Sequence, residues 1–529
     1  MDSIKLQRFE KEARSSGYKL DVLDVLFVLL SSTILLMMLL TTDERYLDFG
    51  DGNYLYISKR LAEGAVLYRD ILAPHPPLLF AVGVILLRIN SSLMPVRLFS
   101  IILGIATSFL TYMLSYKIFA NKKVALVASA IYYMMPIHLT WGRGFEADCL
   151  MIIFSLLAFM CVISLSTKGM ILASFFSVFA LLTKYSFLPN LLFIVGYLYL
   201  RRKSLLKFYL IPLGILISSS FIYLTVYSSG MFFWSTYVVQ TMSPFEDIDI
   251  LQNMMVGFFS IEGPLLLASV LGMLGFIKSG KSLTDCLIGY TLVSFIPLAL
   301  TLRCGTGLYI LYGAEPFIAI FVAYFLSALV TSHMQGLLSR TNRHFSSNRR
   351  LWKGILIGFF TLTLLFNPML DLCVGQFLNF SRYANWSNAP QARQIMAYVE
   401  NYTCNEDFIL SPPYFAFMTN RRLLFDYSET WLWRVAYEHG DARAIELVES
   451  LVTSLESNAV KLVILDFRTK SIGRIYRAIS ENYQLIYKAT IIENFGSIHQ
   501  VYAIDTIEVY IPKSQLPGSA EKKVYKEIL

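Results

Sequence analysis

Long apolar runs follow one another along most of this chain, and they constrain its fold more than any other feature. A helix needs roughly 20 apolar residues to cross a bilayer. Runs that approach or exceed this length are 22–42, 97–119, 124–141, 149–166, 205–228, 255–276, 284–301, 306–331 and 354–371, and two shorter runs, 169–183 and 186–200, flank Lys184. With 56% hydrophobic and 16% charged residues, the 529-residue chain is far more apolar than a soluble domain. These features predict a polytopic α-helical membrane protein.

The basic residues predict how the chain threads through the membrane. The net charge is +8, but Lys and Arg gather in short segments between the apolar runs, as in cytoplasmic loops, which argues against a nucleic-acid partner. The segments are Lys5 to Lys19, Lys117 to Lys123, Lys168, Arg201 to Lys203, Lys278 to Lys281, and Arg340 to Lys353. One threading with a cytoplasmic N-terminus and about eleven spans places all of them inside. It exports residues 43–77 and everything after about residue 372.

Two segments do not fit the pattern of simple spans. Residues 78–95 hold about a dozen consecutive apolar residues, which suits a re-entrant or interfacial helix better than a crossing. Residues 372–529 resemble a soluble domain, with a buried strand at 460–467, an amphipathic helix at 471–483 and further strands beyond. We therefore expect a membrane module, 1–371, with an outer catalytic loop at 43–77, and an exocytoplasmic α/β domain, 372–529.

The threading collects charged residues at the outer face. They are Asp43, Glu44, Asp48, Asp51, Asp70 and His75 in the first loop, Arg143, Glu146 and Asp148 in the second, and Lys184 and Arg303 further on. Charges beside membrane spans are costly and usually functional. Inverting glycosyl transfer needs one carboxylate to take the proton of an acceptor hydroxyl. A leaving lipid phosphate needs cations to stabilise its charge rather than an acid to protonate it. The set contains both carboxylates that could act as the base and cations that could bind the phosphate.

Six of these residues also fit a plainer structural role. Asp51 before Gly52 is typical of a turn. Lys184 and Arg303 could extend from helix ends toward water, and His75 precedes two prolines that favour the start of a helix. Arg143 and Asp148 could form a salt bridge at a helix start, where an aspartate is favourable without any function.

In their order and spacing the residues resemble the outer loops of GT-C-type glycosyltransferases, in particular dolichyl-phosphate-mannose protein mannosyltransferases and the aminoarabinose transferases that modify lipid A. In the first loop the resemblance is carried by Asp51, Tyr54, Leu61, Gly64, Tyr68, Arg69, Asp70, His75, Pro76, Pro77 and Leu78. Further along it is carried by Arg143 with Asp148, by Lys184, and by Arg303, Tyr309, Tyr312 and Pro316. It covers most of residues 20–331.

The resemblance implies transfer of a sugar from a polyprenyl (dolichyl or undecaprenyl) monophosphate to a hydroxyl of a glycan, lipid or protein, with inversion. Asp51 would act as the base or align it, and Asp148 would orient the acceptor or share in its activation. The donor phosphate would be bound by Lys184, Arg303, Arg143 and His75, and substrate by Tyr54, Tyr68, Arg69, Asp70, Tyr309 and Tyr312. No metal is required, although a divalent ion is compatible with the acidic residues.

One departure from the family pattern leaves the base open. The family usually has Asp-Glu where this chain has Asp51-Gly52, whereas Asp43-Glu44 is such a pair directly after the first apolar run. Both sites therefore remain candidates.

We expect the transferase to lie in a cell membrane or in an endoplasmic-reticulum-type membrane. Three other functions remain as alternatives. A transporter or a flippase for lipid-linked sugars is the main alternative, but transporters commonly contain internal repeats, and none stands out here. An oligosaccharyltransferase would carry a tail motif that "FDYSETWLW" does not match. A membrane-anchored receptor would leave Lys184 and the acidic loops without a role.

Overall fold

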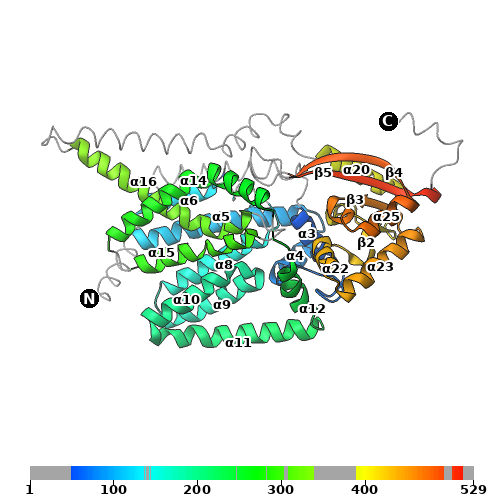
Figure 1. Cartoon of the computed structure of the whole chain (residues 1–529). Helices are drawn as coiled ribbons and strands as arrows, with labels where there is room; N and C mark the ends of the chain where they lie inside the picture. The colour runs from blue at the N-terminus through cyan, green and yellow to red at the C-terminus, as the bar shows by residue number, and fades with distance from the viewer. Residues whose placement is uncertain are drawn as a thin grey trace.

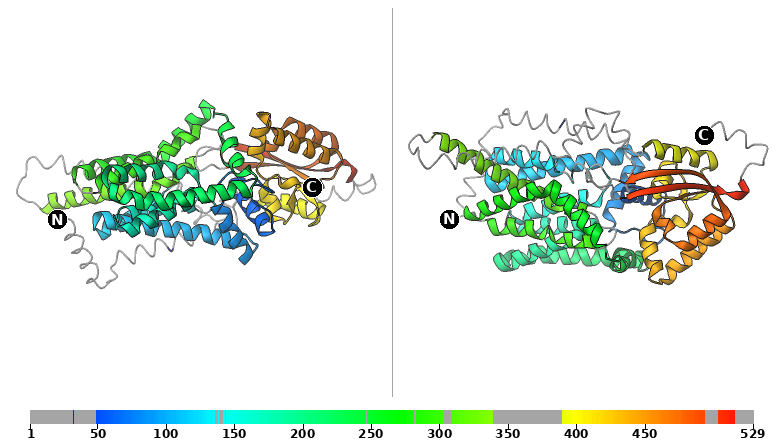
Figure 2. Two further views of the ribbon diagram at one scale, coloured as in Figure 1. Left: turned by 90° about the horizontal axis from the view of Figure 1, so that it is seen from below. Right: turned by 45° about the horizontal axis from the view of Figure 1, so that its top comes forward.

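The computed structural model describes residues 49–338, 389–493 and 503–515 together with Ser32, except for 136–137, 139–141, 143, 246, 281–282 and 303–307. Within these residues the molecule is mostly helical, and an elongated helical bundle carries a small sheet domain at one end (Figures 1 and 2). The apolar runs predicted at 22–42 and 354–371 lie outside the described residues.

The helical part follows the predicted apolar runs closely. Its helices are α3 (Phe49–Ala62), α4 (Leu78–Ile89), α5 (Met94–Phe119), α6 (Lys122–Tyr133), α8 (Ala147–Val162), α9 (Thr167–Thr183), η1 (Tyr185–Phe187), α10 (Leu188–Arg201), α11 (Lys203–Tyr227), α12 (Met231–Phe233), η2 (Trp234–Val238), α13 (Val239–Met242), α14 (Ile248–Lys278), α15 (Thr284–Val293), η3 (Ile296–Leu302), η4 (Leu308–Ala314) and α16 (Glu315–Leu338). Among the residues that the structure describes, three helical stretches, Met94–Phe119, Lys203–Tyr227 and Ile310–Leu329, are long and apolar enough to cross a membrane, and four shorter apolar helices accompany them.

The first outer segment was expected to be a loop, but its described part begins with the helix α3. Asp51 lies in the first turn of α3, and Lys59 and Arg60 lie in its last turn, so the charges oppose the helix dipole at both ends. Gly64, with φ 106°, follows the end of the helix. The predicted half-crossing segment begins with α4, whose 12 residues span about 18 Å. That is shorter than the roughly 30 Å hydrocarbon core of a bilayer.

The sheet domain is an α/β unit, as predicted for the tail. Its elements are α20 (Ala389–Tyr402), β1 (Phe408–Leu410), α21 (Pro413–Met418), β2 (Arg422–Leu423), η5 (Leu424–Asp426), α22 (Thr430–Glu438), α23 (Ala442–Glu456), β3 (Leu462–Leu465), α24 (Phe467–Lys470), α25 (Gly473–Asn482), β4 (Tyr483–Glu493), β5 (Ala503–Pro512) and η6 (Lys513–Gln515). The strand order is β2-β1-β3-β5-β4. β1 pairs in parallel with β2 and β3, while β5 runs antiparallel to β3 and β4. The strands predicted at 460–467 and beyond, and the helix at 471–483, are confirmed.

Alternating side chains of the strands build two different cores. Val463 and Leu465 of β3 pack with α23 and α25. Leu462 and Ile464, on the other face, join a cluster that includes α20, α21 and residues of α3 and α4. The period-2 alternation of a strand therefore connects the sheet to the helical part on one face and leaves the other face to the domain's own helices. In Figure 1, α3 and α4 lie where the bundle meets the sheet domain.

Candidate active site

Asp51 is fixed by two hydrogen-bond donors from different parts of the chain. Nη2 of Arg97 lies 2.6 Å from Oδ2 of Asp51, and the backbone N–H of Phe145 donates to Oδ1 over 2.8 Å. The carboxylate is 3% exposed and Arg97 is 4% exposed. A buried carboxylate is tolerated only with partners of this kind. Asp51 is therefore a buried, hydrogen-bonded carboxylate at the place where α3, α5 and the segment before α8 meet. It is not a surface turn residue.

Arg97 is a residue that the sequence analysis missed. It lies in the first turns of α5, after Pro95, and in the sequence it is the first residue of the apolar run 97–119. The available signal was the rule applied to Lys184 and Arg303, namely that a cation at the edge of a membrane span usually has a partner or a function.

Asp148 and Lys184 form a second buried ion pair. Asp148 lies in the first turn of α8. Lys184 is the extended residue between α9 and η1, at φ −157° and ψ 136°. Its Nζ lies 2.5 Å from Oδ2 of Asp148, and the two side chains are 10% and 3% exposed. Among the described residues, Oδ1 of Asp148 has no hydrogen-bond partner. Lys184 therefore points into the protein rather than toward water.

His75 adds a neutral group beside this second pair. Its Nε2 lies 2.7 Å from the hydroxyl of Tyr54, and its carbonyl oxygen accepts a hydrogen bond from the Tyr68 hydroxyl over 2.8 Å. Burial of the ring, and then the positive charge of Lys184, hold the pKa of His75 well below its ordinary value. The imidazole is therefore uncharged at neutral pH and can exchange a hydrogen bond with a ligand without adding charge.

These groups meet around the start of α8. Phe145 contacts Asp51, Asp148 three residues later contacts Lys184, and the charge of Lys184 acts on His75. Contacts therefore link α3, α5, α8 and the α9–α10 connection, although Asp51 and Lys184 are separated by 133 positions in the chain. Asp51 and the Asp148–Lys184 pair are connected through Phe145 and Asp148, which are three residues apart.

Other predicted residues have different surroundings. Arg69 and Asp70 pair with each other over 2.8 Å on the surface. Tyr68 is 1% exposed, at φ 66°, and its contacts hold the loop that carries His75. Tyr312 is buried, and its hydroxyl lies 3.1 Å from that of Tyr132 and 2.5 Å from Nδ1 of His138. Tyr309 lies in η4.

Four predicted site residues, Asp43, Glu44, Arg143 and Arg303, lie outside the described residues. The choice between Asp51 and the Asp43-Glu44 pair as the base therefore stays open. Among the residues that the structure does describe, no three His, Cys, Asp or Glu side chains are grouped closely enough to hold a metal ion.

Comparisons with known proteins bear on the helical part and on the whole fold. Residues 74–227 match the family model described as dolichyl-phosphate-mannose-protein mannosyltransferase. The matched range holds His75, Asp148 and Lys184. No curated protein sequence matches the chain.

Two solved structures of ArnT from Cupriavidus metallidurans are similar to this chain. The one bound to undecaprenyl phosphate has a TM-score of 0.59 and 13% identity, over 93% of this chain and 99% of the other. The apo structure has a TM-score of 0.56 and 13% identity, over 91% and 97%. A likeness at this identity, extending over nearly all of both chains, shows a shared fold.

Proposed function

The chain is an integral membrane protein with the GT-C glycosyltransferase fold, and from this premise we propose that it transfers a sugar from a polyprenyl monophosphate to an acceptor hydroxyl. The donor lipid is of the dolichyl or undecaprenyl type, the acceptor is a glycan, lipid or protein, and the reaction inverts the anomeric centre. The single observation that carries the proposal is the presence of two buried carboxylate–cation pairs, Asp51–Arg97 and Asp148–Lys184, which are linked through the segment that begins α8.

The placement of basic residues supports an outer-face location for this site. α11 begins at Lys203, directly after Arg201 and Arg202, and ends at Tyr227. The segment after α11 contacts the sheet domain, where Trp234 Nε1 donates to Asp441 over 3.1 Å. The 25-residue helix spans about 37 Å, enough to cross a bilayer. The basic segment and the sheet domain therefore lie at opposite ends of a membrane-length helix, as expected if the sheet domain is exocytoplasmic.

The Asp148–Lys184 pair can exchange partners when the donor binds. The donor is a phosphodiester with one negative charge, and its two unesterified oxygens compete with the Asp148 carboxylate for Nζ of Lys184. Asp148, whose Oδ1 lacks a hydrogen-bond partner among the described residues, is then free to accept a hydrogen bond from the acceptor hydroxyl. In this arrangement Lys184 stabilises the leaving phosphate, and Asp148 orients the attacking oxygen.

The transfer step needs one proton acceptor. The acceptor oxygen forms a bond to the anomeric carbon, the bond from that carbon to the phosphate oxygen breaks, and its electron pair leaves with the phosphate. The hydroxyl proton passes to a carboxylate, for which we favour Asp51, with Asp43 as the alternative. Arg97 fixes the orientation of Asp51.

The proposal is tested by transfer from a labelled donor. Purified protein receives dolichyl phosphate carrying radiolabelled mannose or undecaprenyl phosphate carrying radiolabelled arabinose, and host membranes lacking the protein supply the acceptors. We expect label to move to an acceptor. Asp51→Asn should lower the rate by a factor of about 100 or more, as expected for a lost general base. Lys184→Met should raise KM for the donor lipid.

A matched control tests whether the loss of any aspartate charge would lower transfer. Asp285 is an exposed aspartate that pairs with Arg201 over 2.6 Å, so Asp285→Asn should leave transfer unchanged. Full activity in Asp51→Asn together with loss in Asp43→Asn would move the base to the other acid. If neither substitution lowers transfer, the mechanism is wrong, and movement of labelled lipid across vesicles without transfer would point to a flippase.

A further inference from the structure

Helix α3 presents two different faces to two different parts of the molecule. Asp51, Tyr54 and Ser58, spaced three and four residues apart, contact the helical part through Arg97, His75 and Gly83. Asn53, Tyr56 and Arg60, with the same spacing, contact the sheet domain. Positions three and four apart share one helix face, so one short helix links the candidate base to the sheet domain.

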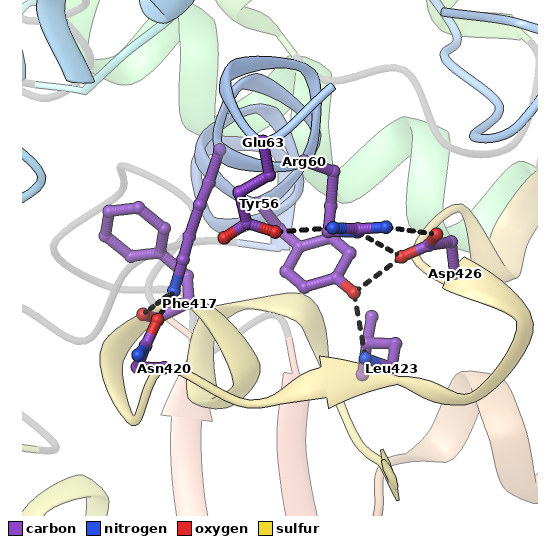
Figure 3. Close-up of polar contacts among 8 residues, drawn as sticks. Tyr56, Arg60, Glu63, Phe417, Asn420, Leu423 and Asp426 are labelled. Atoms are coloured by element: carbon purple, nitrogen blue, oxygen red, sulfur yellow. Dashed lines mark hydrogen bonds and ion pairs between the residues drawn. The ribbon is translucent and has the colours of Figure 1, made fainter. Parts of the chain in front are cut away.

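The contact with the sheet domain centres on Asp426. Its Oδ1 accepts hydrogen bonds from Nε of Arg60 over 2.7 Å and from the Tyr56 hydroxyl over 2.8 Å, and its Oδ2 accepts from Nη2 of Arg60 over 3.1 Å. Figure 3 shows the two-pronged contact and the backbone N–H of Leu423, which donates to the Tyr56 hydroxyl over 2.8 Å. The side chains of Arg60 and Asp426 are 9% and 14% exposed. A bidentate, largely buried pair fixes direction as well as distance.

The backbone at this contact is unusual. Phe425 and Asp426 have φ values of 53° and 49°, in the left-handed region that non-glycine residues rarely adopt. Such a conformation persists only where the surroundings hold it. Here Arg60 and Tyr56 of α3 hold the Asp426 carboxylate through three hydrogen bonds. The loop conformation and the position of α3 therefore depend on each other.

Gly52 brings the two parts into direct contact. A Cβ built at Gly52 would lie 2.9 Å from Cβ and 3.2 Å from N of Tyr414, in α21 of the sheet domain. Real Cβ atoms do not approach so closely, so α21 lies directly against the backbone of α3. This contact gives a physical reason for glycine at the position where the resembling family has glutamate.

The sheet domain contacts α3 through the carboxyl edge of its parallel strands. Tyr414 follows β1, while Asp426 and Glu429 follow β2. In open α/β sheets this edge is where ligands bind. In this chain α3 occupies it, so the sheet domain binds an element of its own membrane module there.

We infer that the sheet domain is a positioning element of the active site, and that Asp426, through Arg60 and Tyr56, sets the place of α3 and with it the place of Asp51. The inference deepens the proposed function and rests on it. Asp426 and Arg60 are positioning residues because, among the described residues, their side chains bond to each other, to Tyr56 and to Glu63 rather than to Asp51, Asp148 or Lys184. Misplacement of a reacting group by about 1 Å can lower a rate by about 100-fold.

The inference is tested with Asp426→Asn, Arg60→Met and Arg60→Lys, each as full-length protein. We expect kcat of the first two to fall about 10- to 100-fold while KM for the donor lipid stays within about twofold, because Lys184 is untouched. Arg60→Lys, which keeps the charge, should recover part of the loss. Arg474 forms an exposed pair with Glu449 in the same domain, so Arg474→Met is the matched control and should transfer normally.

A second measurement does not depend on transfer. Hydrogen exchange should speed up in residues 49–62 of Asp426→Asn and stay unchanged in α8. Unchanged exchange in α3, or a normal kcat in both Arg60→Met and Asp426→Asn, would overturn the inference. A wild-type protein that transfers no label, with exchange in α3 still dependent on Asp426, would overturn the proposed function and leave the docking contact standing.

Discussion

Each of the two faces of α3 is held by an ion pair between an aspartate and an arginine, but the two pairs differ in their exposure to water. On the face toward the helical part, Asp51 and Arg97 are almost completely buried, with side chains 4% exposed each. On the face toward the sheet domain, Arg60 and Asp426 keep some contact with water, at 9% and 14%. Burial raises the penalty for losing one partner, because the remaining charge is left without water. The first face should therefore tolerate substitution less than the second, although both hold one helix.

The largest expected effect is at Arg97. Arg97→Met leaves Asp51 buried without its cation, and breaking a buried pair in this way costs about 3–5 kcal/mol. We expect a large fall in the thermal unfolding temperature of the purified protein in detergent, together with loss of transfer.

The double variant Asp51→Leu with Arg97→Met separates stability from chemistry. It removes both charges, and an apolar pair of similar volume is often neutral or stabilising. The unfolding temperature should return to near the wild-type value while transfer stays absent. If the single Arg97→Met variant is as stable as the wild type, the Asp51–Arg97 pair is not buried away from water as described.

A smaller effect is expected at Gly52, on the second face. Gly52→Ala places a Cβ 2.9 Å from the Tyr414 side chain, and overpacking of this kind costs about 1–3 kcal/mol. The sheet domain should shift on α3, with a moderate loss of unfolding temperature and of kcat. Gly473 has open space around it, so Gly473→Ala is the control in the same domain and should be neutral. Equal behaviour of the two variants would show that α21 does not lie against α3.

The sequence predicted the parts of this arrangement that follow from local pattern. Apolar length predicted the helices, a short apolar run predicted the buried strand β3, and the charges beside apolar runs pointed to Asp148 and Lys184. Contacts between distant segments have no local signature. Asp426 lies 366 positions after Arg60, and within its own sequence it is an ordinary aspartate near a turn. Gly52 was noticed as a departure from a family pattern, but its reason, Tyr414, lies in the other domain.

The smallest expected effect is a pH dependence at Glu429. Asn53 of α3 donates a hydrogen bond to this carboxyl group, which is 4% exposed. Burial raises its pKa from an ordinary 4.5 to about 8, against the opposing effects of Asn53 and of the Arg468 charge. The folded state therefore holds a proton that the unfolded chain releases above about pH 4.5. This contribution to stability is complete below that pH and is lost as the pH rises through about 8.

Glu429→Gln keeps an acceptor for Asn53 and removes the titration. The difference in unfolding temperature between wild type and Glu429→Gln, measured from pH 5 to 9, should change steadily in favour of the variant as the pH rises. Taking the difference removes the contribution of His75, whose lowered pKa acts in the opposite direction in the acidic range. Glu449 is exposed and pairs with Arg474, so Glu449→Gln should show no such trend. A constant difference for Glu429→Gln would mean that its carboxyl group is solvated and that the second face of α3 is held by Asp426 and Tyr414 without it.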